Sequence, residues 1–232
     1  MPTSETTNYS NYVKGLFEEA LLLDPRHGAA YNAYGAAELR HGTAEEARRI
    51  FERGVRANCA DAASIYHGYA KLELSLGNVD EARGKLQEGL KEAQLNDFGM
   101  DSQHRERAIF LSHTLGMMEL NSNRPKQGLE VFTDGIDRFG NSSQLLMGAA
   151  QCQVKLGRED LARKLFERSV LVDPKHAQAW QAWGVMEMRA GDISTARKLF
   201  DCGIKSTPFH GALWQAYATM ESRLGDFEKA RS

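Results

Sequence analysis

Large, small and turn-forming residues repeat along this chain with the period of a helical hairpin. Between His176 and Ile204, Trp180 and Trp183 are followed by Gly184, and a turn signal follows at Gly191. Aromatic residues three apart, followed by a small residue, place large and small surfaces on one helical face. The run after Gly191, ISTARKLFDCGI, has a second helical pattern. The stretch therefore predicts a helix, a tight turn and an antiparallel second helix.

The same pattern recurs along nearly the whole chain. Its predicted turns lie at Gly42, Gly77, Asn123, Gly157, Gly191 and Gly225. The last four are evenly spaced, whereas the interval between the second and the third is longer by roughly a dozen positions. We expect the residues inserted there to lengthen a second helix and to form a polar loop. A self-similar hairpin of this length predicts an all-α fold, a right-handed α-solenoid of antiparallel helix-turn-helix repeats.

The predicted units divide the chain as follows. Residues 9–26 hold the second helix of a partial repeat, and full repeats are expected at 27–59, 60–94, 108–141, 142–175 and 176–209, with an insertion at 95–107 and a partial repeat at 210–232. Because the pattern begins and stops inside a unit, we expect the chain to be a fragment of a longer array.

Turn and cap chemistry supports these bounds. Five of the six turns carry glycine, which takes the left-handed conformation that commonly ends a helix. Thr43 and Asn78 each precede a glutamate by three residues, as in a capping box. Asp192 and Asp226 can accept hydrogen bonds from free amides at a helix start, and Pro125 suits a first helical turn.

A glutamate and an arginine recur ten residues apart across the turns. The pairs are Glu38 and Arg48, Glu73 and Arg83, Glu187 and Arg197, and Glu221 and Arg231. We expect partly buried ion pairs that fix helix register, formed either within a hairpin or at the next interface. The pattern is interrupted at Leu129, where arginine is expected, and at Gln153, where glutamate is expected.

Composition excludes several functional classes. The 232 residues are 42% hydrophobic and 26% charged, and no apolar run is long enough to cross a membrane. The three cysteines are far apart and lack the spacing of a zinc site or a disulfide framework. No phosphate-binding loop, metalloprotease motif or nucleophile motif is present. We therefore expect a non-enzymatic protein with no cofactor, metal or small-molecule substrate.

The repeat resembles a known family. Helical repeats of about 34 residues are typical of tetratricopeptide proteins, but here glutamate ends the first helix and Ala-Arg-x-x-Phe marks the second. This pattern resembles the HAT (half-a-tetratricopeptide) repeat of RNA-processing proteins. AWQAWGVMEMRAGDISTARKLF and LWQAYATMESRLGDFEKAR are similar to chloroplast HAT proteins that mature and stabilise photosystem II messenger RNA. The resemblance implies a chloroplast location, with the nucleus as the alternative. The start of the chain shows no transit peptide.

First helices line the concave side of hairpin solenoids, so equivalent positions form rows there. Ten residues before the turns lie Asn32, His67, His113, Met147, Gln181 and Gln215, and two residues before them lie Arg40, Lys155, Arg189 and Arg223 together with Ser75 and Asn121. Amide and imidazole groups beside cations suit single-stranded RNA. The net charge of −2 lacks the basic excess of many RNA-binding proteins. Binding of single-stranded RNA on the concave face is therefore expected, with a protein scaffold of an RNA-processing complex as the alternative.

Overall fold

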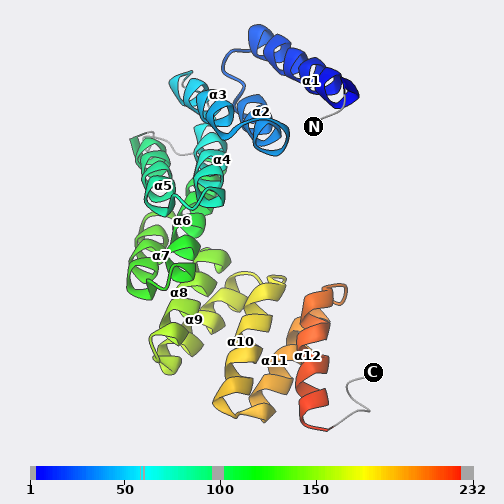
Figure 1. Ribbon diagram of the computed structural model, residues 1–232. Coiled ribbons are helices and arrows are strands. Elements are labelled where there is room, and N and C mark those ends of the chain that lie inside the picture. Colours follow the sequence, from blue (N-terminus) through cyan, green and yellow to red (C-terminus); the bar gives the residue numbers. More distant parts are fainter. Residues whose placement is uncertain (1–3, 58, 60, 96–101, 226–232) are drawn as a thin grey trace. The chain divides into compact units, whose positions relative to one another are not determined.

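The computed structural model describes residues 4–57, 59, 61–95 and 102–225 of the chain. These residues form twelve helices and no strand (Figure 1). The all-α fold expected from the hairpin period is confirmed.

The bounds of the helices are α1 (Ser4–Leu23), α2 (Gly28–His41), α3 (Ala44–Arg56), α4 (Ala62–Ser75), α5 (Val79–Leu95), α6 (Ser102–Asn121), α7 (Pro125–Phe139), α8 (Ser143–Lys155), α9 (Glu159–Val172), α10 (Ala177–Ala190), α11 (Ile193–Ser206) and α12 (Gly211–Arg223). In the hairpins α2–α3, α4–α5, α8–α9 and α10–α11, a short turn joins two helices that pack against each other and run antiparallel.

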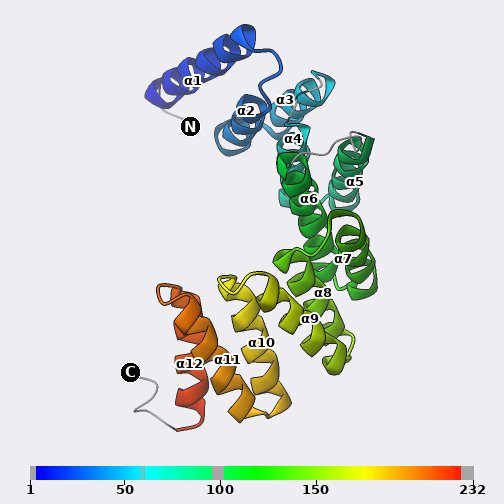
Figure 2. The same ribbon diagram turned by 180° about the vertical axis from the view of Figure 1, so that it is seen from behind.

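The chain forms two compact units, Met1–Leu115 and Gly116–Ser232, with their boundary inside α6. In the first unit, the hairpin α2–α3 is followed by α4–α5, and α2 packs directly on α4. In the second unit, α8–α9 is followed by α10–α11 and then by α12 (Figure 2). There α10 packs on both α8 and α12. Within each unit, the first helix of one hairpin therefore lies against the first helix of the next.

A phenylalanine in each of four second helices forms the centre of the core. Phe51, Phe132, Phe166 and Phe200 are all at most 1% exposed. Most of these rings stack on an aromatic ring of the following hairpin: Phe51 on Tyr69 with centroids 5.6 Å apart, Phe166 on Trp183 at 6.3 Å and Phe200 on Tyr217 at 5.5 Å. The repeated aromatic positions thus bind successive hairpins together through buried apolar surface.

The loops that join hairpins are also tied to the following helix. Trp180 Nε1 donates to the carbonyl oxygen of Pro174 at 2.9 Å, and Trp214 Nε1 donates to that of Pro208 at 2.7 Å. The Tyr31 hydroxyl makes the equivalent bond to Pro25 at 3.2 Å. In these three hairpins, the first of the two aromatic residues of the first helix thus satisfies a loop carbonyl.

Five turn residues have the left-handed backbone. These are Gly77, Asn123, Gly157, Gly191 and Gly225, with φ between 59° and 87°. Gly42 is the exception, because its φ is −120°. A side chain is excluded there by space, since a Cβ on Gly42 would lie 2.0 Å from Glu38 Oε2. The expectation that Gly42 is left-handed was wrong.

Helix starts mostly have the predicted caps. Thr43 Oγ1 accepts from the Glu46 amide at 3.2 Å, and Asp192 Oδ1 accepts from the Thr195 amide at 3.0 Å. Pro125 begins α7. The Nδ2 of Asn78 donates to Glu73 Oε2 at 2.8 Å. Asp226 lies outside the described residues.

The inserted residues are more helical than expected. α5 has 17 residues and α6 has 20, whereas the other first helices have 13 or 14. Residues 102–107, expected in a loop, form the first turns of α6. The insertion therefore lengthens the first helix of the third hairpin as well as the second helix before it.

Candidate functional site

Three glutamates of the recurring pairs bond to an arginine of the preceding hairpin, whereas Glu38 pairs with Lys14 of α1 at 3.0 Å. Arg48 Nε and Nη2 donate to Glu73 Oε1 and Oε2 at 2.7 and 2.9 Å. Arg163 donates to Glu187 at 2.9 and 3.0 Å, and Arg197 donates to Glu221 at 2.6 and 2.8 Å, with the same bidentate geometry. We call each of these three pairs a clasp. Each of these glutamates therefore pairs with the arginine of the preceding hairpin and not with the arginine of its own hairpin. Glu221, for example, pairs with Arg197. Arg231 lies outside the described residues.

The carboxylate of each clasp is buried and the arginine is half-exposed. The side chains of Glu73, Glu187 and Glu221 are at most 2% exposed, and those of the three arginines are 32–37% exposed. The hydrogen bonds from Arg48 lower the pKa of Glu73 against the opposing effect of burial. Trp183 Nε1 also donates to Glu187 Oε1 at 3.0 Å. These carboxylates are therefore fully occupied by structural contacts.

The two interruptions in the pattern belong to one junction. Leu129 in α7 and Gln153 in α8 stand as far apart in sequence as Arg163 and Glu187 do. Both members of a clasp are therefore replaced together, which avoids a buried charge without a partner. Gln153 is 8% exposed, and its Oε1 has no hydrogen-bond partner among the residues that the structure describes.

Charge is distributed unequally between first and second helices. The only carboxylates of α2, α4, α8, α10 and α12 are those of Glu38, Glu73, Glu187 and Glu221, each at most 3% exposed. The exposed Lys and Arg side chains of these first helices are Arg40, Lys71, Lys155, Arg189 and Arg223. Second-helix cations more often pair with carboxylates of their own helix, as Arg49 does with Glu46 and Arg138 with Asp134. The surfaces of these five first helices are therefore positive although the whole chain has a net charge of −2. The remaining first helix, α6, also carries the exposed Glu106.

Much of the predicted polar row is occupied by packing. Asn32 Oδ1 lies against α4, where a Cβ on Gly68 would be 2.1 Å from it. The His67 ring lies 4.5 Å from the Phe110 ring, and burial lowers its pKa. His113 is partly buried. Met147 is 7% exposed and packs with Phe166. These four positions do not present a row of free polar groups.

The rest of the predicted surface is accessible in the second unit. Gln181 is partly exposed and Gln215 is exposed, on α10 and α12. Lys155, Arg189 and Arg223 are exposed at the ends of α8, α10 and α12, and we call them the cationic row. No ion pair is found for these three side chains within the described part of the chain. In the first unit, Arg40 is exposed and donates from Nε to the Ala36 carbonyl at 3.2 Å.

Two further glutamines face solvent on the same helices. Gln144 on α8 and Gln178 on α10 are exposed and lie one repeat apart, three positions before Met147 and Gln181. They were missing from the two predicted rows, although their common position in the repeat is a signal that could have identified them. The first helices of the second unit thus combine exposed amides with exposed cations.

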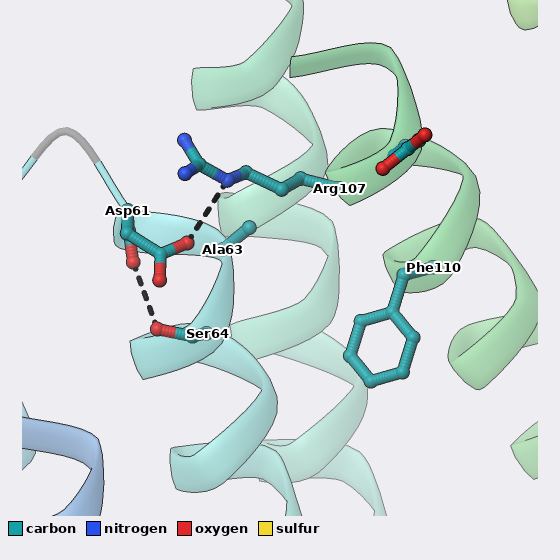
Figure 3. Close-up of a pocket in the computed structure, with 6 residues that line it drawn as sticks. Asp61, Ala63, Ser64, Arg107 and Phe110 are labelled. Carbon is teal, nitrogen blue, oxygen red and sulfur yellow. Dashed lines mark hydrogen bonds and ion pairs between the residues drawn. The ribbon is translucent and has the colours of Figure 1, made fainter. Parts of the chain in front are cut away.

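The first unit has an open cavity of about 410 Å³ between the start of α4 and α6. Figure 3 shows Arg107 reaching from α6 towards Asp61, with Nε 3.1 Å from Oδ1. Ser64 Oγ donates to the Asp61 carbonyl at 3.0 Å, and the Phe110 ring is 43% exposed at the opposite wall. The lining therefore pairs Arg107 with Asp61 and leaves the Phe110 ring partly open to solvent.

Within the described ranges, no three His, Cys, Asp or Glu residues are grouped to hold a metal ion. No helix among them has the length and apolar character needed to span a membrane. Burial raises the pKa of the Cys152 thiol to about 12, which makes it unreactive at neutral pH.

Comparison with known proteins identifies the repeat. Two tetratricopeptide repeat models match the chain, one at residues 14–62 and 44–97 and the other at residues 120–183. Together they match well over half of the 232 residues.

A curated relative, the Protein CTR9 homolog of Arabidopsis thaliana, is 32% identical over 76 residues. The match includes 32% of this chain but only 7% of that protein's length. A tetratricopeptide repeat protein from Parabacteroides merdae has a similar structure, with a TM-score of 0.62 and 15% identity, covering 97% of this chain and 88% of that one. YrrB, a TPR protein with an unusual peptide-binding site, has a TM-score of 0.52 and 20% identity, covering 86% and 96%. These structural similarities concern the fold.

Proposed function

Because the chain belongs to the tetratricopeptide repeat family, we propose that it is a non-enzymatic scaffold that holds a segment of a partner protein along its first helices. The observation that carries this proposal is that the first helices bury their charged carboxylates and expose their amides. The buried Glu187 and Glu221 are bound in clasps, whereas Gln178, Gln181 and Gln215 are accessible. A surface of amides on packed helices offers donors and acceptors for a bound chain.

Similarity of fold to YrrB supports the choice of a peptide as ligand, since that protein has a peptide-binding site. Binding on rigid elements costs less ordering entropy than binding on loops. The stacked rings and clasps between α9, α10, α11 and α12 provide that rigidity in the second unit.

Single-stranded RNA remains the second candidate, favoured by the cationic row of Lys155, Arg189 and Arg223. It has less support as a one-base-per-repeat reader, because Met147 is buried and His67 is covered by Phe110. The closer resemblance to HAT proteins of RNA processing, and the chloroplast location that it implies, stay predictions.

Site-specific photo-crosslinking tests the proposal. A photoreactive phenylalanine analogue is placed at Gln215 on α12 and, as a control, at Lys198 on α11, which is also exposed. Irradiation in the cells that produce the protein should yield adducts from Gln215 that a protease shortens and ribonuclease leaves intact. Equal adducts from the two positions would contradict a first-helix site. Adducts that ribonuclease removes would replace the protein partner with RNA.

A further inference from the structure

Within the described part of the second unit, no ion pair is found for the cations of the cationic row. Lys155, Arg189 and Arg223 occupy the same position, two residues before the turn, in three first helices that pack in succession. The carboxylates two residues before Arg189 and Arg223, those of Glu187 and Glu221, are buried and held by arginines of the preceding second helices. The carboxylate nearest to Lys155 in sequence is that of Glu159, which pairs with Arg163. The three cations therefore face solvent without compensating charge from their own helices, and such a surface attracts anionic partners.

The packing of the helices sets the spacing of these cations. Helices in direct contact have axes about 8–10 Å apart. An extended chain advances about 3.3–3.6 Å per residue, so three residues cover the same interval. Every third side chain of an extended segment can therefore lie opposite one cation of the row.

Amides on α10 and α12 favour an extended partner over a helical one. Gln181 and Gln215 lie eight residues, or about 12 Å along the helix, before Arg189 and Arg223. Gln178 and Gln181 on α10 and Gln215 on α12 can bond to backbone N–H and C=O groups. An extended segment leaves those groups unpaired, whereas a helix satisfies them internally and binds through an apolar stripe. The exposed positions on these helices include these amides, and the exposed large apolar side chain on α12 is that of Trp214, at 41%.

We propose that the partner segment is acidic and extended, with a carboxylate side chain at about every third residue lying along Lys155, Arg189 and Arg223. This inference rests on the proposed function and specifies the chemistry of the partner. It also explains why the first helices α8, α10 and α12 carry no exposed carboxylate: a negative charge there would repel the bound segment.

Synthetic peptides of about twelve residues, long enough to pass three packed helices, test the spacing. The first repeats Glu-Ser-Ser, the second has the same composition with its glutamates in one block, and the third repeats Lys-Ser-Ser. Fluorescence anisotropy with the full chain should give the tightest binding for the first peptide, and binding should weaken in ~1 M salt, where screening is strong. Equal affinity for the first and second peptides, or no binding of the first at low salt, would overturn the inference.

A matched pair of triple variants locates the site. Replacing Lys155, Arg189 and Arg223 by alanine should weaken binding of the Glu-Ser-Ser peptide about tenfold, from the sum of three exposed charge contacts. Replacing Lys164, Lys198 and Lys205 by alanine removes the same charge from exposed positions of α9 and α11 and should leave the affinity nearly unchanged. Equal losses in both variants would show a general charge effect and overturn the assignment.

Two further ligands separate this inference from the proposed function. An acidic helical peptide with glutamate every seventh residue advances about 10.5 Å per repeat, and tighter binding of that peptide would overturn the extended geometry. A single-stranded RNA oligonucleotide is the second ligand. If it binds more tightly than the Glu-Ser-Ser peptide, and the variant of Lys155, Arg189 and Arg223 loses that binding, the assignment of an acidic protein segment to the row would be overturned. If crosslinking at Gln215 yields protein adducts but the chain shows no preference for the Glu-Ser-Ser peptide, the proposed scaffold function stands and only this inference is rejected.

Discussion

Arg163 of one hairpin and Glu187 of the next are joined by two hydrogen bonds, with Nε 2.9 Å from Oε1 and Nη2 3.0 Å from Oε2. The glutamate is 2% exposed and the arginine 37% exposed. The pair thus connects two hairpins through a buried carboxylate whose charge depends on a partner at the protein surface. Removing the arginine should therefore cost more than removing both residues.

The substitution Arg163→Leu leaves the Glu187 carboxylate buried without its cation and should destabilise the protein by about 3 kcal/mol. This is the lower end of the range for buried pairs, because water reaches the arginine. The double variant Arg163→Leu with Glu187→Gln reproduces the natural pair Leu129 and Gln153 and should recover most of that loss. Urea unfolding measures both. A double variant no more stable than the single one would contradict this account of the clasp.

Phe166→Ala should cost about 3–5 kcal/mol, because the side chain is 1% exposed and its removal leaves a cavity between two hairpins. Trp183→Ala should cost less although the residue is larger, since the indole is only partly buried. Thermal unfolding of the two variants gives the order directly. A lower midpoint for Trp183→Ala than for Phe166→Ala would place the centre of the core at the tryptophan.

Gly148→Ala should destabilise the second unit by about 1–3 kcal/mol through overpacking. A Cβ at this position would lie 2.3 Å from Cζ of Phe132, whose ring is also enclosed by Gly116. Gly84→Ala in α5 is the matched control, because a Cβ there meets nothing within 4 Å. That control should stabilise its helix by about 0.5–1 kcal/mol. Chemical denaturation should show opposite signs, and two losses of equal size would refute the packing argument.

Stability should fall as the pH is lowered from about 7.5 to 5.5. Burial lowers the pKa of His176, whose Nδ1 lies 2.6 Å from Ser143 Oγ, and burial with nearby Lys71 lowers that of His67. Below the ordinary pKa of 6.5 the unfolded chain binds protons that the folded imidazoles resist, so protonation favours unfolding. Glu73 has a lowered pKa, and its contribution is lost only below its ordinary 4.5.

The variants His176→Gln and His67→Gln measure these contributions separately. Asp173 and Ser169 also bear on His176: the Asp173 charge opposes the lowering of its pKa, and Ser169 Oγ bonds to Ser143 Oγ at 2.9 Å. Each variant should flatten the dependence of the urea midpoint on pH. An unchanged slope in both would assign the effect to other groups.

The turns could be predicted from the sequence because glycine or asparagine at a fixed interval has a local cause. The clasps could not be assigned uniquely. In an array of equal repeats, a first-helix glutamate has one arginine in its own unit and an equivalent one in the unit before it. Glu187 therefore fits the pattern equally well with Arg197 and with Arg163. Only packing shows that the first-helix glutamate faces the preceding hairpin.

The candidate surface was predicted less well than the fold. Spacing along a helix identified the rows but not how deeply each position is covered, so Met147 was grouped with the exposed Gln215. The net charge of −2 is a sum over the whole chain, so it does not show that first and second helices differ in charge. Counting charges for each predicted helix would have revealed that difference from the sequence.

Each clasp joins the second helix of one hairpin to the first helix of the next through the same two residue types. A hairpin with glutamate in its first helix and arginine in its second can follow any other of the same kind, so duplication or exchange of a whole unit would preserve every such contact. The α7–α8 junction, with Leu129 and Gln153, breaks that interchangeability in the second unit. A unit moved across it would bring a buried charge to a partner that cannot neutralise it, so this junction fixes the order in which units can be rearranged.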